Sequence, residues 1–219
     1  MPSVLITGAN RGIGLEFARQ YAADGWDVIA TVRESSPELD RLGVCIEQLE
    51  MRDLDSVAAF ASRVGGALDL LIANAGTWIP ETSETAEDGR QWAEMMVTNC
   101  IGPYLLGKAL LPRMTPQRGK LIAISSRMGS IADSSGGYVP YRTSKSALNM
   151  AWNALAHEAR ALGIAPAVLN PGWVKTRMGG PNAPMRPEDS IAQMRGVIDG
   201  LTLDQSGSFL NRDGTPIPW

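Results

Sequence analysis

Short apolar runs rich in β-branched residues alternate with helical patterns along all 219 residues of the chain. This alternation is typical of parallel strands that are joined by crossover helices. The expected strands are Val4–Thr7, Asp27–Val32, Val44–Leu49, Leu68–Ala73, Gly119–Ser125, Ile164–Leu169 and Gly207–Leu210. The expected helices lie near Ile13–Ala23, Leu54–Val64, Gly89–Leu111, Tyr141–Leu162 and Pro187–Leu201, and Ser35–Leu42 is a candidate for a further short one. Right-handed crossovers then predict an α/β fold, with a doubly wound, seven-stranded parallel sheet and helices on both faces.

Composition limits the classes of partner. With 44% apolar residues the chain can bury one continuous core, which predicts a single domain over residues 1–219. The net charge is −3 and basic residues are not clustered, which argues against nucleic-acid binding. The first strand begins at once and no segment has the roughly 18 apolar residues of a membrane span. The two cysteines have no metal-site or disulfide spacing. We therefore expect a soluble, cytoplasmic protein without a bound metal.

A glycine-rich turn follows the first strand and opens the first helix. It reads Thr7-Gly8-Ala9-Asn10-Arg11-Gly12-Ile13-Gly14. Glycines in such a turn let the backbone approach a pyrophosphate, which then sits on the helix N-terminus. The spacing is one residue wider than the usual dinucleotide fingerprint, and a glycine-rich turn can also be a simple tight connection. Its place between a strand and a helix favours a Rossmann-type dinucleotide site that includes Asn10, Arg11 and Ile13.

The residues after the second strand indicate which dinucleotide binds. An NAD site usually has an acidic residue there, which accepts from the ribose 2′-hydroxyl. This chain has Arg33 instead and no carboxylate before Glu34. Arg33 and Arg11 can together bind a 2′-phosphate, although either one alone can be merely solvated. The missing acid and the two arginines favour NADP(H), and NAD(H) stays open.

Tyr141 and Lys145 stand four residues apart on a predicted helix. Their Cβ atoms should therefore lie on one face, about 5–6 Å apart. An ammonium group beside a phenol favours the phenolate and should lower the tyrosine pKa. Such a tyrosine can protonate a carbonyl oxygen or deprotonate an alcohol. Taken alone, the pair fits a solvated helix face equally well.

Several motifs occur in one order over about residues 4 to 176 and together resemble the short-chain dehydrogenase/reductase family. They are Thr7–Gly14, Asn74-Ala75-Gly76, Asn99, Ser126, Tyr141-x-x-x-Lys145 and Pro171-Gly172. The resemblance implies a catalytic tetrad of Asn99, Ser126, Tyr141 and Lys145, in which Lys145 and Tyr141 also contact the cofactor. It implies further cofactor contacts from Gly8, Gly12, Gly14, Glu50, Met51, Asn74, Ala75, Gly76, Pro171, Gly172, Val174 and Thr176.

Two positions depart from the family pattern. Glu50-Met51 stands where the family has an Asp-Val pair that cradles adenine. Ser126 and Tyr141 are fifteen residues apart, wider than the usual family spacing. The extra length falls in the loop Ser130–Gly137, which we expect to bulge outward.

Asn99 has a physical argument of its own. Pro103 lies four residues later and has no N–H, so the Asn99 carbonyl loses its helical hydrogen bond. In the resembling family that carbonyl holds a water bonded to the lysine, which starts a proton path to solvent. A simple proline kink is the alternative, and the other motifs favour the relay.

The segment Ser-Ser-Arg-Met-Gly-Ser-Ile, the box Tyr-Arg-x-Ser-Lys and the C-terminal Asp213–Trp219 resemble the C-factor/Sniffer branch of the family. This branch contains small carbonyl reductases, some of them tied to signalling. The short loop Arg177–Pro181 suggests an open, tolerant site. Candidate pocket residues, which would otherwise be core, are Trp78, Met128, Tyr138, Trp173 and Met178.

The expected function is that of an NADPH-dependent carbonyl reductase or alcohol dehydrogenase. It would transfer hydride between nicotinamide and a small carbonyl compound or secondary alcohol, with Tyr141 as general acid and base. The alternative is an NADP(H)-binding signalling or regulatory protein with little turnover; a dehydratase, an epimerase or an acyl-thioester reductase are weaker options. Family members pair through the helices that carry Asn99 and Tyr141, which implies a homodimer or homotetramer. Candidate interface residues, equally suited to the core, are Leu105, Leu106, Leu148, Trp152 and Leu155.

Overall fold

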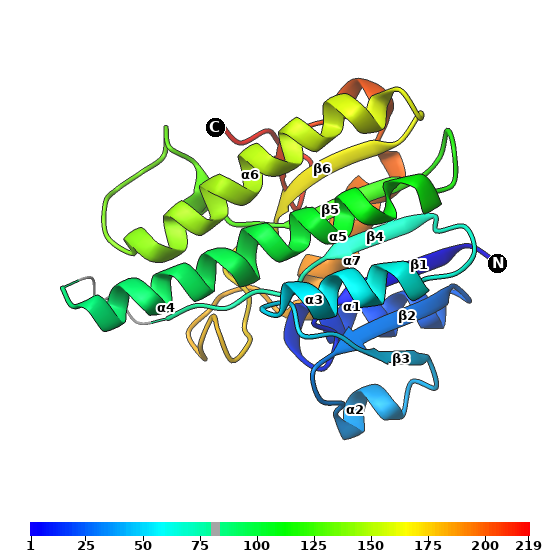
Figure 1. Ribbon diagram of the computed structural model, residues 1–219, viewed down its shortest axis with the longest axis horizontal. Coiled ribbons are helices and arrows are strands. Elements are labelled where there is room, and N and C mark those ends of the chain that lie inside the picture. The colour runs from blue at the N-terminus through cyan, green and yellow to red at the C-terminus, as the bar shows by residue number, and fades with distance from the viewer. Residues whose placement is uncertain (80–83) are drawn as a thin grey trace.

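The computed structural model describes residues 1–79 and 84–219. Its centre is a parallel sheet of seven strands in the order β3-β2-β1-β4-β5-β6-β7 (Figure 1). The strands are β1 (Ser3–Thr7), β2 (Asp27–Val32), β3 (Cys45–Gln48), β4 (Leu70–Ala73), β5 (Lys120–Ile124), β6 (Ala165–Asn170) and β7 (Ser208–Asn211). The predicted doubly wound sheet is confirmed, and the ends of the predicted strands are shifted by at most two residues.

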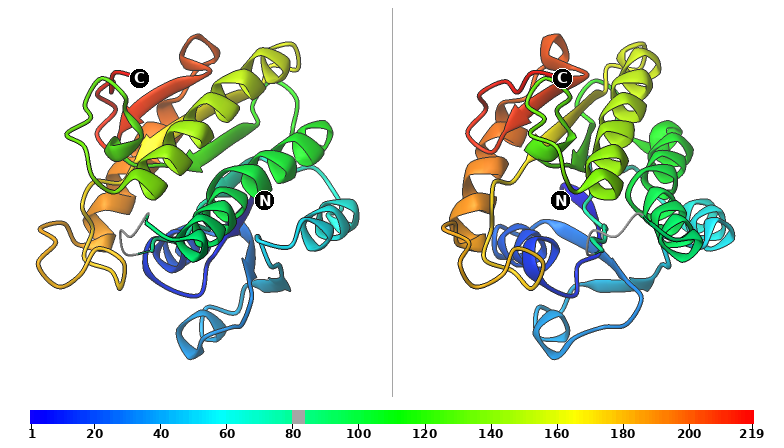
Figure 2. Two further views of the ribbon diagram at one scale, coloured as in Figure 1. Left: turned by 60° about the vertical axis from the view of Figure 1, so that its left-hand side comes forward. Right: turned by 90° about the vertical axis from the view of Figure 1, so that its left-hand side faces the viewer.

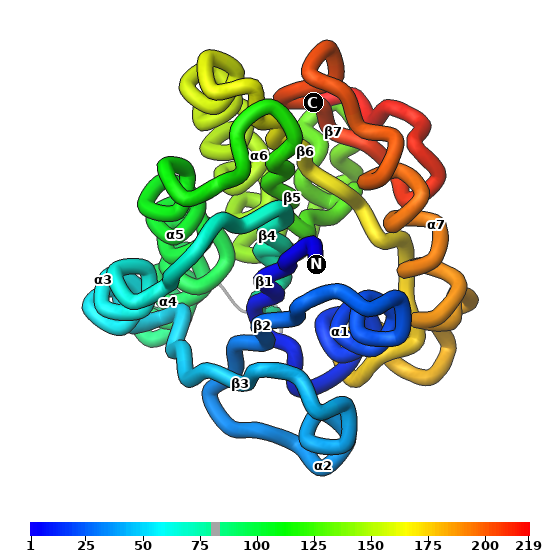
Figure 3. The backbone as a smooth tube through the Cα atoms, turned by 90° about the vertical axis from the view of Figure 1, so that its right-hand side faces the viewer, coloured from blue at the N-terminus to red at the C-terminus, as the bar shows by residue number. Residues whose placement is uncertain are grey.

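Helices cover both faces of the sheet. They are α1 (Gly12–Ala23), α2 (Pro37–Asp40), α3 (Leu54–Arg63), α4 (Ala86–Met96), α5 (Gly102–Leu110), α6 (Val139–Arg160) and α7 (Pro187–Gly200). Short helical turns add η1 (Val97–Ile101), η2 (Leu111–Arg113), η3 (Arg127–Gly129) and η4 (Leu203–Gln205). Figures 2 and 3 show α1 and α7 on one face and α3, α5 and α6 on the other. None of the helices described has both the length and the apolar composition to cross a bilayer.

Each face of the sheet has its own apolar core. Leu5, Leu71 and Leu121 pack with Trp152 under α5 and α6. On the opposite face, side chains such as Ile6 and Ile72 pack with residues of α1 and α7, among them Phe17, Tyr21, Ile191 and Met194. Burial on both faces explains why the strands read as continuous apolar runs. Of the candidate interface residues, Leu106, Leu148, Trp152 and Leu155 belong to the core, and Leu105 is exposed.

The predicted helix Gly89–Leu111 is wrong in two respects. It begins earlier, at Ala86, because Thr85 and Asp88 form a capping box at its N-terminus. It is also interrupted by the π-helical turn η1, in which the N–H of Gly102 donates to the carbonyl of Val97. Pro103 provides no N–H for a regular α-helical bond at this point, and π-turns insert where the regular ladder fails. A simple kink is thus replaced by a π-turn, and Asn99 lies inside it.

Candidate active site

The carboxyl ends of the central strands border one cavity of about 1750 Å³. It lies beside the paired strands β1 and β4, where the strand order reverses, the position at which doubly wound folds bind ligands. All of the predicted site residues line it except Gly14 and Asn99, which lie behind its wall. The structure therefore brings together residues that are more than 160 positions apart in the chain.

The glycine turn is shaped to receive a pyrophosphate. Gly8 and Gly12 have φ values of +68° and +55°, in the left-handed region that favours glycine. A Cβ on Gly14 would lie 2.3 Å from the carbonyl oxygen of Gly8, so only glycine lets α1 start this close to the turn. The first turn of α1 carries no acidic residue, and Arg11 precedes it. Free N–H groups at a helix N-terminus beside a cation fit a bound phosphate group.

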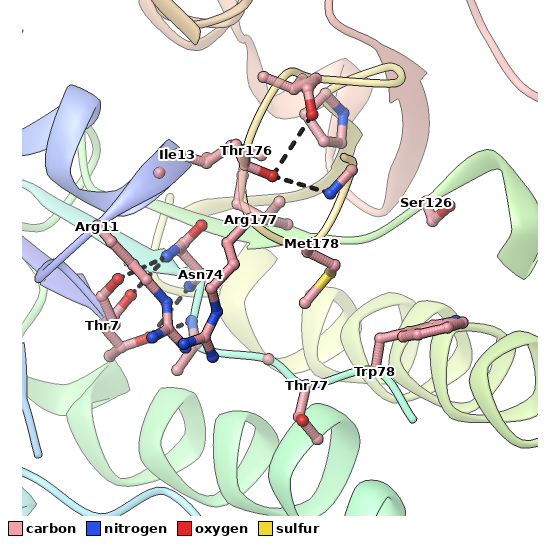
Figure 4. Close-up of a pocket in the computed structure, with 18 of the residues that line it drawn as sticks. Thr7, Arg11, Ile13, Asn74, Thr77, Trp78, Ser126, Thr176, Arg177 and Met178 are labelled. Carbon is pink, nitrogen blue, oxygen red and sulfur yellow. Dashed lines mark hydrogen bonds between the residues drawn. The ribbon is translucent and has the colours of Figure 1, made fainter. Parts of the chain in front are cut away.

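Asn74 braces the glycine turn from β4. Its side-chain amide donates to the carbonyls of Thr7 (2.9 Å) and Gly8 (3.2 Å). Thr7 Oγ1 in turn accepts from the backbone N–H groups of Asn74 and Ala75, at 3.0 and 2.9 Å (Figure 4). Asn74 thus holds the loop in shape, and its amide hydrogens are used within the protein.

The residues expected at the adenosine end lie around the ends of β2 and β3. Arg33 is exposed and its Nη1 lies 3.7 Å from Glu50 Oε2. Glu50 also accepts from the backbone N–H of Arg52, at 3.0 Å. Met51 is buried, and Asn10 donates to the carbonyl of Glu34. The glutamate that replaces the family's aspartate therefore faces a cation and is tied to its own turn.

Ser126, Tyr141 and Lys145 meet at the other end of the cavity. Ser126 follows β5 and accepts from the N–H of Met128, and its hydroxyl lies close enough to Tyr141 to lower the pKa of that phenol. Lys145 Nζ lies 5.8 Å from the centre of the Tyr141 ring and donates to the carbonyl of Ile124 at 2.9 Å. The neighbouring Ser125 is structural, because its hydroxyl donates to Asn149 in the core.

The extra length between Ser126 and Tyr141 bulges outward, as predicted. Every residue from 131 to 139 is exposed. Ser126 nevertheless reaches Tyr141, because Asn170 holds the start of the segment: its Oδ1 accepts from the N–H of Arg127 (3.1 Å) and of Gly172 (3.3 Å). Asn170 was not among the predicted site residues, although it directly precedes the Pro171-Gly172 motif.

The expected fall in the Tyr141 pKa is not found in the protein chain. Burial raises the pKa of Tyr141 to about 12, and the nearby hydroxyl of Ser126 only partly offsets this. Burial also lowers the pKa of Lys145 to about 8. The ammonium group is directed at the Ile124 carbonyl, so desolvation of the phenolate outweighs attraction to the cation. Tyr141 is therefore protonated at neutral pH, and Lys145 is still mostly charged.

Asn99 positions this end of the site from behind. It is fully buried, and its Oδ1 accepts from the N–H of Thr77 at 2.7 Å. Its Nδ2 donates to the carbonyl of Thr77 (2.8 Å) and to Ser144 Oγ (3.0 Å). Asn99 therefore links the segment after β4 to α6, one residue before Lys145. The water relay through its carbonyl stays a prediction.

The mouth of the cavity beside Ser126 is apolar. Trp78, Tyr138, Trp173 and Met178 are 40–59% exposed and line it, together with the half-buried Met128. Figure 4 shows Trp78 and Met178 on either side of the space that Ser126 faces. These residues belong to the pocket, as predicted, rather than to the core.

Arg177 is one of several cations that line the cavity and were not predicted. Arg177 directly follows Thr176 and lines the same cavity as Arg11. The pKa of Arg11 is lowered by burial and by the nearby charges of Arg177 and Arg33. Only a basic residue next to a predicted cofactor contact could have pointed to Arg177 from sequence.

Comparison with known proteins agrees with this geometry. The family model described as short chain dehydrogenase matches residues 2–187. C-signal of Myxococcus xanthus is 40% identical over 164 residues, which cover 74% of this chain and 99% of that protein. Carbonyl reductase Sniffer of D. melanogaster has a TM-score of 0.92 at 33% identity, with both chains covered in full. The NADPH-bound carbonyl reductase from chicken fatty liver has a TM-score of 0.91 at 35% identity, covering 100% of this chain and 94% of its own.

The matched segment contains the glycine turn, the Ser126–Tyr141–Lys145 cluster and Pro171-Gly172, which are the parts of the chain that build the cavity. On this sequence match and these similarities, the chain belongs to the short-chain dehydrogenase family.

Proposed function

We propose that the protein is an NADPH-dependent carbonyl reductase, able to run in reverse as an alcohol dehydrogenase, built as one cofactor-binding domain over residues 1–219. One observation carries the proposal: Ser126, Tyr141 and Lys145 share a single cavity with the glycine turn. A proton donor therefore stands at one end of a cleft whose other end is shaped for a dinucleotide phosphate.

The residues present favour NADP(H). Arg33 is an exposed cation directly after β2, at the expected 2′-phosphate position, Arg11 is an exposed cation of the neighbouring glycine turn, and no carboxylate precedes Glu34 after β2. Glu50 lies opposite Arg33 at 3.7 Å, a long contact that leaves Arg33 able to bind a phosphate. The similarity to a carbonyl reductase solved with NADPH supports the same choice, and NAD(H) is the alternative cofactor.

The bound nicotinamide would supply the hydride that reduces the carbonyl carbon. The protein's own residues would bind and protonate the carbonyl oxygen. Ser126 Oγ would donate a hydrogen bond to the substrate oxygen. Tyr141 would protonate that oxygen, because its pKa of about 12 keeps the phenol protonated at neutral pH. Lys145, charged at pH 7, would stabilise the phenolate that remains. Burial of the phenol thus keeps Tyr141 in the protonated form that reduction requires.

The pocket mouth indicates the substrate class. Trp78, Trp173 and Met178 offer apolar and aromatic surface within reach of Ser126. Such surfaces bind apolar groups without strict shape selection. We propose that small aromatic or aliphatic aldehydes and ketones are reduced, over a range of structures.

The test is oxidation of NADPH and NADH, followed at 340 nm, with a panel of ketones, aldehydes, quinones and 3-oxoacyl thioesters. Tyr141→Phe removes the proposed acid, and Tyr138→Phe removes a phenol from the pocket mouth as a matched control. We expect NADPH to be preferred, and turnover to fall by about 10²–10⁴ only in Tyr141→Phe. Equal activity of Tyr141→Phe and the wild type would overturn the assigned role.

Similarity to C-signal supports a second candidate function, an NADP(H)-binding signalling protein with little turnover. Calorimetry separates the two candidates. NADPH binding without turnover of any compound in the panel would favour the signalling function.

Two further features are proposed with the function: a cytoplasmic location and a homodimer or homotetramer. Leu105 on α5 and Met150 on α6 are apolar side chains that face solvent on the helices expected to pair. Light scattering of the purified protein gives its mass in solution, and a monomer would refute the proposed assembly.

A further inference from the structure

The loop after β6 is packed directly against the glycine turn. A Cβ on Gly12 would lie 3.3 Å from Thr176 Cγ2. The two residues are far apart in the chain, yet their side-by-side position brings their neighbours, Arg11 and Arg177, into the same part of the cavity. The contact of Thr176 with Gly12 therefore brings the backbones of Arg11 and Arg177 close to one another.

The base of this loop is firmly tied. Lys175 N–H donates to the carbonyl of Met185 at 2.8 Å, and Met185 N–H donates to Trp173 at 3.3 Å. Within the loop, Thr176 Oγ1 accepts from Gly179 N–H, and Trp173 Nε1 donates to the Gly179 carbonyl at 2.7 Å. Arg177 thus projects from a turn whose two ends are hydrogen-bonded to one another.

Arg11 and Arg177 extend toward one another across the cleft beside Asn74 (Figure 4). Several other arginines that line the cavity have an acidic partner: Arg33 faces Glu50, and Arg127 pairs with Asp133, whereas Arg212 has no ion pair within the described residues. Neither Arg11 nor Arg177 forms an ion pair with any residue in the described ranges 1–79 and 84–219.

This arrangement is electrostatically unfavourable without an anion. Burial lowers the pKa of Arg11, and the charges of Arg177 and Arg33 lower it further, as expected when like charges share a site. An anion between the two guanidinium groups would turn the repulsion into two charge-assisted hydrogen-bonding contacts. The glycine turn at the N-terminus of α1, directly beside them, is itself a phosphate-binding shape.

We propose that Arg177 and Arg11 grip the pyrophosphate of the dinucleotide from two sides, so that bound cofactor fastens the loop of residues 174–185 to the glycine turn. The proposal rests on the dinucleotide site of the proposed function. The pyrophosphate is the favoured group because Thr176 lies against Gly12, whereas Arg33 extends from the end of β2 toward the expected 2′-phosphate.

The grip links cofactor to substrate. Met178, the next residue, lines the apolar mouth beside Ser126. Fastening Arg177 would therefore set the position of Met178, and the substrate pocket would be complete only after the dinucleotide has bound.

The test compares Arg177→Met, Arg33→Met and the control Arg113→Met, which removes an exposed cation outside the cavity. Dissociation constants for NADPH, NADH and ADP-ribose are measured by calorimetry, and circular dichroism checks folding. Arg177→Met should weaken all three ligands alike, by about 10- to 100-fold, the loss expected for a charge-assisted bond. Arg33→Met should weaken the binding of NADPH only, and Arg113→Met should leave the binding of all three ligands unchanged.

Trypsin gives a second measurement, because Lys175 lies in the loop. ADP-ribose should slow cleavage after Lys175 in the wild type and much less in Arg177→Met. Unchanged affinities in Arg177→Met, or a loss confined to NADPH, would overturn the pyrophosphate grip. Absence of any dinucleotide binding by the wild type would overturn the proposed function as well, whereas binding without turnover would leave the grip intact and refute the reductase activity alone.

Discussion

The side-chain amide of Asn99 donates a 3.0 Å hydrogen bond to Ser144 Oγ, across the contact between the π-turn η1 and α6. The same amide group is bonded twice to the backbone of Thr77. One buried side chain therefore fixes the distance between the segment after β4 and the helix that carries Tyr141 and Lys145.

Asn99→Ala should destabilise the protein more than Ser144→Ala. The first change leaves both backbone groups of Thr77 unpaired, at a cost of about 1–3 kcal/mol for each buried group. The second removes a single acceptor of the Asn99 amide, because Ser144 otherwise donates to the Tyr141 carbonyl. Urea unfolding of both variants measures the difference, and equal losses of unfolding free energy would contradict the bracing role.

Reductase activity should fall as the pH rises through about 8. Lys145 loses its proton near that pH, and the phenolate formed by Tyr141 then loses its neighbouring cation. Tyr141 itself stays protonated until about pH 12, so it does not limit the rate earlier. The pH profile of kcat/KM reports the pKa values of the free enzyme and gives the measurement. A profile flat up to pH 10 would show that the charge on Lys145 is not needed.

Lys145→Met should stabilise the fold at neutral pH. The folded-state pKa of Lys145 is about 8, below the ordinary value of 10.5, so the unfolded chain binds its proton more tightly. The ammonium therefore destabilises the native state fully below about pH 8, and the penalty disappears as the pH rises toward 10.5. We expect a gain of about 1–3 kcal/mol at pH 7 that shrinks by pH 10. Thermal unfolding at both pH values decides, and a gain independent of pH would point to packing instead.

Gly14→Ala should abolish dinucleotide binding and destabilise the protein. The new Cβ would lie 2.3 Å from the Gly8 carbonyl and 2.6 Å from the Asn74 amide. Overpacking of this kind costs roughly 1–3 kcal/mol and would push the glycine turn out of shape. Gly196→Ala in α7 is the control, since nothing lies within 4 Å of the added Cβ. That variant should bind NADPH normally and be slightly more stable, because alanine favours a helix.

The sheet could be predicted from sequence because its strands are buried on both faces and therefore read as apolar runs between helices. The start of α4 at Ala86 could have been predicted from the sequence, because Thr85 and Asp88 have the spacing of a capping box. The π-turn could not be predicted from the sequence, since the apolar period of the two helices on either side continues across it. Arg177 was not predicted as a site residue, because its position beside Arg11 depends on the contact of Thr176 with Gly12, which the sequence alone does not show. The raised pKa of Tyr141 depends on burial, which residue spacing does not report.

The outward bulge between Ser126 and Tyr141 has a consequence for how this enzyme type diversifies. Ser126 is held through Asn170, and Tyr141 is held by α6, so neither position depends on the number of residues between them. We therefore expect insertions and deletions there to leave Ser126 and Tyr141 in place while they reshape the wall to which Tyr138 belongs. A change of substrate selectivity through this segment would then need no change at Ser126 or Tyr141.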